Sequence, residues 1–280
     1  MLKRSIKLVI SVLVFCIDYC INQFYRCLKL EAKGKCVILY YHEIHSSQRA
    51  NFVKQLDILK KYAKPILLST ANLVPNERAF VITFDDGMSS VIENALPELK
   101  RRQIPSVIFV PVSYLGKKPS WPGIEEHILK HESVITETDI RELDKSGLIE
   151  IGSHCMSHSD LTYMQDEVAE EEITKSKIYL ENIINKAVNF ISFPHGEHKV
   201  CHIKQAKNAG YVKAFSIVPE QVSGSFDKYV IGRVRIDATD WNIEVSLKVL
   251  GAYRWLSALF AIKRDNLYRR INEDKRDDVR

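Results

Sequence analysis

The sequence predicts an α/β fold built on a parallel sheet, either open or closed into a barrel. Between residues 36 and 242, short runs rich in β-branched and aromatic residues alternate with helical patterns. Strand and helix in alternation are typical of parallel sheets with crossover helices. This stretch has no internal repeat, low-complexity tract or linker, so we expect one domain there.

The expected elements follow one another closely along the chain. The expected strands are residues 36–41, 79–84, 105–110, 148–152, 188–193, 211–217 and 229–235. The helices between them include residues 52–62, 91–102, 137–146, 166–184 and 200–208. Gly210 follows the last of these helices, at the position where glycine commonly ends a helix. If the sheet closes into a barrel, the chemistry belongs at the carboxyl ends of the strands.

The positive charge of the chain is concentrated at its N-terminus. The formal net charge is +5, and residues 1–35 contain seven Lys and Arg against two acidic residues. The rest of the chain is therefore close to neutral. A basic end on a neutral body favours an anionic membrane surface as a partner and argues against nucleic acid.

Residues 1–34 predict an amphipathic segment that associates with a membrane. The apolar stretch 8–21 resembles a signal peptide, but no small-x-small cleavage site follows it. It is shorter than the about 20 apolar residues of a spanning helix, and Asp18 would be costly inside a bilayer. On a helix, one stripe holds Arg4, Lys7, Ser11, Asp18, Asn22, Arg26, Lys29 and Lys33. We expect a helix lying in the membrane interface, with a signal anchor and a helix packed on the protein body as alternatives.

Residues 243–280 predict a C-terminal amphipathic helix followed by a charged tail. The apolar positions at helical spacing are Val245, Val249, Leu250, Tyr253, Leu256, Leu259 and Phe260. This helix either closes the core or makes a second membrane contact. From Arg264 onward, mixed charges indicate a solvated, frayed end.

Two adjacent carboxylates follow a buried strand. The run 79–84 leads directly into Asp85, Asp86 and Gly87. Adjacent acids at a buried strand end repel each other and lose hydration unless a positive charge neutralises them. The pair therefore indicates a metal ion, although an acidic turn at a strand end would give the same short motif.

Two histidines follow a second strand. His154 and His158 come after residues 148–152 and are four positions apart. Two imidazoles at this spacing can reach one metal from a helical turn or a tight loop, and a carboxylate completes a set that leaves positions open for water. Such a histidine pair is common by chance. Together with the paired acids at another strand end, it favours a shared metal site.

These two motifs resemble those of the polysaccharide deacetylases with the NodB homology domain, also called carbohydrate esterase family 4. Residues 83–87 match the first family motif. Residues 150–161 resemble the metal-histidine motif, with Ser159 where proline is usual. The resemblance extends over residues 36–242, and we take residues 35–242 as the NodB-like domain.

The resemblance implies both a fold and a division of chemical roles. The fold would be a distorted (β/α) barrel of about seven strands with amphipathic terminal helices. Asp85 would be the general base, while Asp86, His154 and His158 would bind one divalent ion, with Zn²⁺ as the first expectation. A divalent ion polarises an amide carbonyl and acidifies water, and a neighbouring carboxylate can take the proton of that water.

The third family motif is altered in this chain. Phe193, Pro194, His195 and Gly196 stand where the family has an aromatic-Pro-Tyr-Gly run, and Ser192 stands where the family has an arginine that pairs with the base. We expect this run to bind substrate, with the backbone N–H of residue 195 helping to bind an oxyanion. The alternative is that this run only forms the turn that ends a strand and has no role in binding.

Residues near the end of the domain can complete the altered motif. Arg233 or Arg235 could replace the missing arginine, and Trp241 is a candidate substrate contact. The family's last motif, Leu-x-His, is absent because no histidine follows His202.

His42 is the candidate replacement for the absent last histidine. Residues 39–42 have a similar pattern, an apolar strand that ends in histidine. If this strand takes the barrel position of the family's last strand, His42 reaches the same mouth as general acid or substrate contact. A structural histidine is the alternative.

The expected reaction is hydrolysis of an N-acyl group, acetyl by first expectation, from an amino sugar of a polysaccharide or lipid-linked glycan. The terminal segments favour a bacterial inner membrane. Six scattered cysteines without CxxC pairs favour its cytoplasmic face over the periplasmic one. The rival functions are O-deacetylation, deformylation of a lipid-linked sugar, and glycan binding by a degenerate, non-catalytic barrel. The intact Asp85, Asp86, His154 and His158 argue against the last of these.

Overall fold

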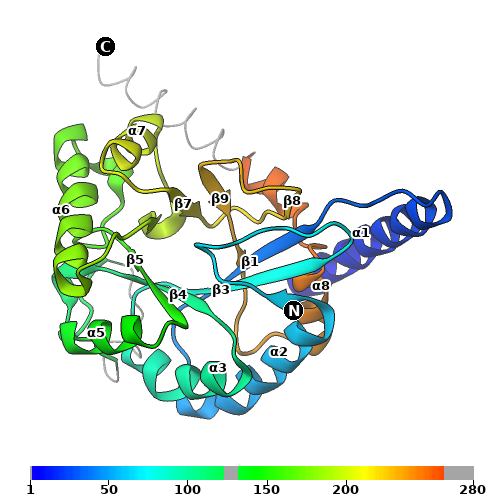
Figure 1. Ribbon diagram of the computed structural model, residues 1–280, viewed down its shortest axis with the longest axis horizontal. Coiled ribbons are helices and arrows are strands. Elements are labelled where there is room, and N and C mark those ends of the chain that lie inside the picture. The colour runs from blue at the N-terminus through cyan, green and yellow to red at the C-terminus, as the bar shows by residue number, and fades with distance from the viewer. Residues whose placement is uncertain (1, 123–131, 262–280) are drawn as a thin grey trace.

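The computed structural model describes residues 2–122 and 132–261. In this part of the chain, eight strands form a nearly closed, barrel-shaped sheet with helices around it (Figure 1). Their spatial order is β10 (Val234–Arg235), β1 (Lys35–Tyr41), β3 (Arg78–Phe84), β4 (Ser106–Val110), β5 (Ile149–Ser153), β6 (Phe190–Ser192), β7 (Lys213–Ser216) and β9 (Val230–Gly232). Neighbours along this path pair in parallel. The expected α/β barrel is therefore confirmed.

Short strands and helices complete the fold. β2 (Lys64–Pro65) pairs with β3, and β8 (Val222–Ser223) pairs with β1. The helices are α1 (Leu2–Cys27), α2 (Arg49–Tyr62), α3 (Leu96–Arg102), α5 (Glu137–Lys145), α6 (Asp166–Ile184), α7 (Val200–Asn208) and α8 (Asn242–Val249). The expected crossover helices are present at their positions, although a π-helical turn at Val91–Ala95 precedes α3. Gly210 has φ 87° just after α7, the left-handed conformation of a helix-ending glycine.

The sheet separates two hydrophobic cores. Successive residues of a strand point to opposite faces, so one set fills the barrel and the other packs under the helices. Val81, Phe109 and Phe215 belong to the inner set. The inner space is full, because a Cβ atom added to Gly152 would lie 2.4 Å from the Phe109 ring. Chemistry is therefore restricted to the mouth of the barrel.

The barrel closes where the sequence predicted a single strand at residues 229–235. The structure divides this strand into β9 and β10, which are the two ends of the sheet. Arg233 is the residue between them, and its side chain is 0% exposed. Gly232 permits the close approach of another segment here, because an added Cβ atom would lie 2.0 Å from the Val218 carbonyl oxygen. The chain thus crosses from one edge of the sheet to the other within one residue.

Part of the polar stripe of α1 faces the protein body. Asp18 accepts two hydrogen bonds of 2.7 Å from the Arg254 guanidinium. Ser11 accepts one of 3.0 Å from the indole N–H of Trp255. Ser11 is 0% exposed and Asp18 is 9% exposed. This part of the polar stripe therefore packs on the protein body, as the alternative of a packed helix predicts. The interfacial interpretation instead placed the stripe at the membrane surface.

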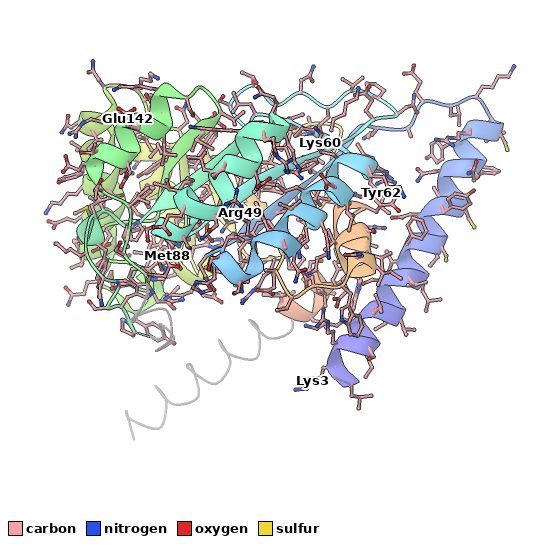
Figure 2. All side chains as sticks on the ribbon, turned by 90° about the horizontal axis from the view of Figure 1, so that it is seen from below. Lys3, Arg49, Lys60, Tyr62, Met88 and Glu142 are labelled. Carbon is pink, nitrogen blue, oxygen red and sulfur yellow. The ribbon has the colours of Figure 1, made fainter. Side chains whose placement is uncertain are left out.

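The opposite face of α1 is apolar and exposed. The helix projects from the body (Figure 2), and its exposed apolar residues include Leu2, Ile6, Val9, Leu13, Ile17, Ile21 and Phe24. Cys16, Cys20 and Cys27 are also exposed. By length and composition, α1 could cross a membrane.

The C-terminal segment does not form the one continuous helix that its spacing predicted. α8 ends at Val249, and turns follow before a further helical stretch begins at Leu256. Gly251 interrupts the pattern with φ 80°, and an added Cβ atom would lie 2.0 Å from the Gln221 side chain. The charged tail expected from Arg264 onward lies outside the described residues.

Candidate active site

The three candidate metal ligands meet at the carboxyl ends of β3 and β5. Asp86 Oδ1 lies 3.0 Å from His158 Nε2 and 3.4 Å from His154 Nε2. One ligand atom from each residue lies within 4.8 Å of the other two. All three residues are buried. The two sequence motifs therefore form one cluster, as their strand-end positions predicted.

The backbone around this cluster is held in a rarely populated conformation. Asp86, Cys155, His158 and His195 have φ between 56° and 67°. The left-handed region is uncommon for residues other than glycine and persists where the surrounding structure enforces it. These backbone conformations fix the directions of the ligand side chains.

The donor set fits a divalent metal ion. Asp86 Oδ1 is buried without a hydrogen-bond partner among the described residues, although both imidazole Nε2 atoms face it. A buried carboxylate oxygen left unpaired is costly. His154 Nδ1 lies 2.7 Å from the Ser192 carbonyl oxygen, to which its N–H can donate, leaving Nε2 free to coordinate. One carboxylate and two imidazoles are typical ligands of Zn²⁺.

Aromatic rings enclose His158. Its ring centroid lies 4.4 Å from that of Trp121 and 4.9 Å from that of His195, which is approached edge to face. Trp121 is buried and also contacts Tyr114. No periodic pattern or motif in the sequence marks Trp121, since it lies in a loop far from both motifs. Its position beside His158 is a finding of the tertiary structure.

Asp85 forms a buried ion pair with Arg233. The two Nη atoms of Arg233 each donate to one carboxylate oxygen of Asp85 at 2.7 Å. Arg233 also donates to Ser192 Oγ at 2.8 Å and to Thr83 Oγ1 at 3.0 Å. Of the two arginines considered as partners of Asp85, the structure selects Arg233. Arg235 instead binds the Asp237 carboxylate.

This ion pair sets the protonation state of Asp85. Burial by itself raises the pKa of the Asp85 carboxyl, but the charge of Arg233, followed by that of His154, more than offsets it. The pKa of Asp85 is therefore below its ordinary value. Asp85 is a carboxylate aimed into the barrel mouth beside the metal-ligand cluster.

His42 lies at the same mouth. It directly follows β1, the neighbour of β3, and is partly exposed. Its ring centroid lies 5.6 Å from that of Tyr40, which in turn lies under the Arg233 guanidinium. A positive charge on His42 is close enough to lower the pKa of both Asp85 and Asp86. The first strand thus ends with His42 beside the strand that carries Asp85, and the role of His42 stays a prediction.

The residues of the altered third motif lie at different depths. Phe193 and Pro194 are buried, and the Phe193 ring stacks on His198 with centroids 4.9 Å apart. His195 is exposed beside His158. Gly196 has φ 74°, and an added Cβ atom would lie 2.5 Å from Ile217. Phe193 and Pro194 therefore anchor the loop in the core, whereas the His195 side chain is exposed to solvent.

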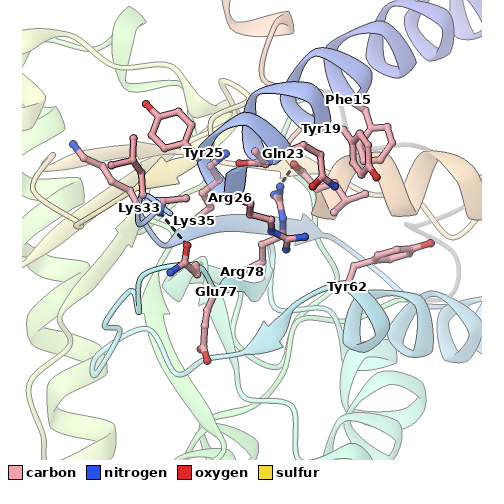
Figure 3. Close-up of a pocket in the computed structure, with 15 residues that line it drawn as sticks. Phe15, Tyr19, Gln23, Tyr25, Arg26, Lys33, Lys35, Tyr62, Glu77 and Arg78 are labelled. Atoms are coloured by element: carbon pink, nitrogen blue, oxygen red, sulfur yellow. Dashed lines mark hydrogen bonds between the residues drawn. The ribbon is translucent and has the colours of Figure 1, made fainter. Parts of the chain in front are cut away.

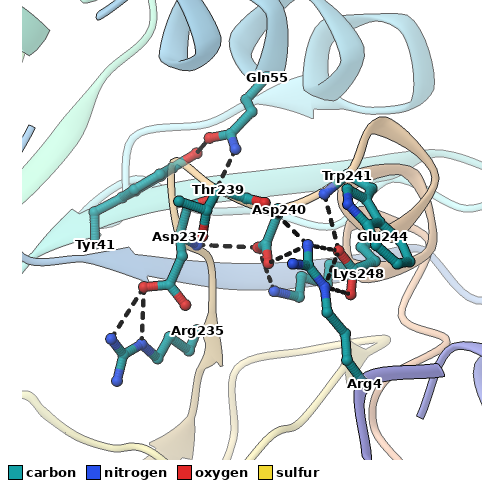
Figure 4. A network of polar contacts seen from close by, with 10 residues as sticks. All are labelled: Arg4, Tyr41, Gln55, Arg235, Asp237, Thr239, Asp240, Trp241, Glu244 and Lys248. Carbon is teal, nitrogen blue, oxygen red and sulfur yellow. Dashed lines mark hydrogen bonds and ion pairs between the residues drawn. The ribbon is translucent and has the colours of Figure 1, made fainter. Parts of the chain in front are cut away.

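A polar network connects the segment between β10 and α8 to α1 (Figure 4). Trp241 is 48% exposed, and the Arg4 guanidinium lies 4.2 Å from the centroid of its ring. Arg4 Nε donates to the Glu244 carboxylate at 2.9 and 3.0 Å. Lys248 binds the Asp240 carboxylate. The first turn of α1 thus holds the loop that carries Trp241.

A cavity of about 710 Å³ adjoins this network. Tyr40, Arg235 and Ile217 line the end at the barrel mouth, and Lys3 and Lys7 of α1 line the other end. The cavity therefore extends from the carboxyl ends of β1 and β10 to the start of α1.

Comparison with known proteins gives a consistent result. The family model described as polysaccharide deacetylase matches residues 73–214. YxkH of Bacillus subtilis strain 168, whose name suggests a polysaccharide deacetylase, is 26% identical over 221 residues, which cover 75% of this chain and 74% of YxkH. The poly-β-1,6-N-acetyl-D-glucosamine N-deacetylase of Staphylococcus aureus strain MSSA476 is 26% identical over 168 residues. That match covers 57% of this chain and 55% of the relative.

Solved structures share the fold. IcaB from Ammonifex degensii has a TM-score of 0.63 and 23% identity, and the match covers 78% of this chain and 98% of IcaB. BC0361, a polysaccharide deacetylase from Bacillus cereus, has a TM-score of 0.62 and 24% identity, with coverage of 78% and 69%. The barrel is therefore an arrangement found in other proteins.

Proposed function

Because the chain belongs to the polysaccharide deacetylase family, we propose that it is a metal-dependent hydrolase that removes N-acetyl groups from amino sugars of a glycan. The observation that carries the proposal is the convergence of Asp86, His154 and His158 on one point beside the ionised Asp85. A relative named for N-deacetylation of a β-1,6-linked N-acetylglucosamine polymer supports the N-acyl substrate.

In this proposal, Asp86, His154 and His158 hold one divalent ion, with Zn²⁺ favoured by the ligand types. A bound ion would supply Lewis-acid polarisation of the acyl carbonyl and a more acidic water. The chain supplies the orientation. The Ser192 carbonyl fixes the His154 tautomer, and the Trp121 ring covers one side of His158.

Asp85 is proposed as the general base. It must remain ionised near neutral pH to accept a proton from the attacking water, and its bidentate pair with Arg233 maintains that state. The same pair holds both carboxylate oxygens in a fixed orientation. Arg233 is a positioning residue in this scheme, since it is 0% exposed and acts through its hydrogen bonds to Asp85.

His42 is proposed as the general acid that protonates the leaving amine. An amine leaves poorly unless it is protonated, and an imidazole titrates near working pH. His42 follows β1, adjacent to the strand that carries Asp85, and its charge acts on both carboxylates of the site. His195, exposed beside His158, and Trp241, exposed at the start of α8, are proposed to contact sugar rings, with Phe193, Pro194 and Gly196 shaping the loop.

The substrate is proposed to be a lipid-linked or nascent glycan at a bacterial inner membrane. The exposed apolar face of α1 supports membrane contact, and its flanking lysines favour anionic lipid. The cavity from Tyr40 to Lys7 gives a glycan a path from this helix to the mouth. We place the enzyme on the cytoplasmic face, on the basis of its unpaired cysteines.

The test combines product analysis with metal analysis. Purified protein, with and without chelator, is incubated with N-acetylated glycans and lipid-linked sugars, and mass spectrometry follows the loss of acetyl or formyl groups. Loss of acetyl that depends on metal is expected. Loss of formyl alone, or of O-linked acetyl alone, would assign a rival function, and no turnover on any substrate would favour a glycan-binding barrel.

Metal analysis of variants tests the ligand set. Asp86→Ala and His154→Ala are expected to lose the ion. Cys201→Ala is the control, because Cys201 lies in a separate group of side chains, with Asp166 and His202, whose geometry could also hold a metal ion. Full occupancy in both ligand variants would refute the assignment.

A further inference from the structure

A second cavity lies at the end of the barrel opposite the candidate active site (Figure 3). Its volume is about 290 Å³, and it is bounded by the second half of α1 and the first residues of β1 and β3. At about 3.3 Å per strand residue, Arg78 at the start of β3 and Asp85 after its end are roughly 20 Å apart. The cavity is therefore separate from the site described above.

Like charges face each other in this cavity. Lys35 and Arg78 are register partners on the neighbouring strands β1 and β3, and both line the cavity. Like charges directly opposite each other destabilise a strand pair. Burial, followed by the charge of Arg78, lowers the pKa of Lys35. Burial is also the largest influence on Arg78, whose pKa is lowered although Asp18 opposes the shift.

The nearby acids are already engaged with other bases. Glu77, the one acid among the described lining residues, lies 2.6 Å from Lys64 Nζ. Asp18 is held by both Nη atoms of Arg254. The lining also includes Arg26 and Lys33, so positive charge is in excess. Within the described residues, the Arg78 guanidinium donates one hydrogen bond, from Nη1 to the Leu250 carbonyl oxygen at 3.1 Å.

Aromatic and aliphatic side chains also line the cavity. Phe15, Tyr19 and Tyr62 line the cavity. Tyr19 and Leu30, which both line the cavity, are 55% and 52% exposed. A ligand that suits these walls has an anionic head for the cations and an apolar tail that leaves the cavity past these exposed side chains.

We propose that this cavity binds the phosphate of an anionic phospholipid headgroup through Arg78, Lys35 and Arg26. A phosphate matches the fork of an arginine and relieves the repulsion between the two strand residues. The proposal rests on the membrane contact of α1 proposed above. It adds a defined headgroup site, which would hold the end of the barrel opposite the mouth at the membrane surface and leave the mouth open to substrate.

The first experiment measures binding of the full-length protein to vesicles of phosphatidylcholine, with or without phosphatidylglycerol. Lys35→Gln/Arg78→Gln should reduce affinity for the anionic vesicles by about tenfold or more, because each basic residue at an anionic surface contributes measurably. Lys100→Gln/Lys204→Gln removes the same charge from exposed positions outside the cavity and should leave affinity unchanged. Equal affinity of the cavity variant and the wild-type protein would overturn the proposal.

A second measurement separates a lipid site from a site for free phosphate and does not depend on membrane binding. Soluble glycerol 1-phosphate should raise the melting temperature of the wild-type protein but not that of Lys35→Gln/Arg78→Gln. Stabilisation by inorganic phosphate without a preference for anionic vesicles would overturn the lipid assignment. Neither measurement depends on turnover of a glycan. A protein that lacks the proposed deacetylase activity can therefore still show, or fail to show, headgroup binding at this cavity.

Discussion

Asp85 and Asp86 are adjacent in the chain but have different partners. Asp85 is bound by Arg233, whereas Asp86 faces His154 and His158. A metal ligand and a general base need different carboxylates, since coordination occupies the lone pairs that would accept a proton. The positive φ of Asp86 turns its side chain away from the direction taken by Asp85.

Asp85→Asn should therefore remove activity while the metal remains bound. An amide cannot accept the proton of the attacking water, so turnover should fall by about 10² to 10⁴-fold. Metal content by elemental analysis and turnover on an N-acetylated glycan are the two measurements. Near-normal turnover would exclude Asp85 as the base.

His42→Ala should lower turnover without affecting metal content or fold. The expected loss on amide substrates is about 10² to 10⁴-fold, because the leaving amine then lacks a proton donor. Activated esters, whose leaving groups need no proton, should retain more activity. A similar loss on both substrate types would return His42 to a structural role.

In the helices beside the barrel, one glutamate carboxylate pairs with three arginines. Glu98 of α3 lies within hydrogen-bonding distance of Arg49, Arg101 and Arg102. These contacts, that with Arg49 first, lower the Glu98 pKa to about 2, against 4.5 for the free side chain. The carboxylate therefore links α3 to the start of α2 only while it is ionised.

The pKa shift of Glu98 predicts an acid-dependent loss of stability. A carboxyl whose pKa is depressed on folding stabilises the protein above its unfolded pKa, and this contribution disappears as pH falls toward the folded pKa. Glu98→Gln should be less stable than wild type at pH 7, and the difference should shrink between pH 4.5 and about 2. Urea unfolding across this range is the measurement. A pH-independent difference would show that the charge of Glu98 does not contribute.

In the whole molecule, α1 turns an apolar face outward and makes polar contacts with the protein body through other residues. Arg4 and Asp18 attach α1 to the segment that contains Glu244 and Arg254. A helix that only lies on the surface would be expected to do the reverse and bury its apolar face. This arrangement is consistent with a bilayer against the exposed face.

Deletion of residues 1–34 should release the protein from membranes. High salt should release the intact protein in part, because attraction between its lysines and anionic lipid is screened within about 10 Å at 0.1 M salt. Flotation of vesicles with both proteins is the measurement. A protease-protected fragment that corresponds to α1 would instead identify a spanning anchor.

Local patterns in the sequence were sufficient to predict most of the barrel and the main residues of the candidate site. Strand and helix periodicities depend on near neighbours, so the seven expected strands lie close to those observed. Asp85 and His154 directly follow β3 and β5, and Asp86 and His158 lie in the loops that come after them. The carboxyl ends of parallel strands share one edge, so these residues had to lie together once the fold was known.

The tertiary structure alone decided which distant residues pair. Arg233 and Arg235 are two positions apart and chemically alike, and only closure of the sheet between β9 and β10 points Arg233 at Asp85, 148 positions earlier in the chain. Likewise, the α1 pattern defined an apolar and a polar face but not which one meets the protein. Such choices depend on contacts between residues far apart in sequence, which periodicity and strand-end position do not encode.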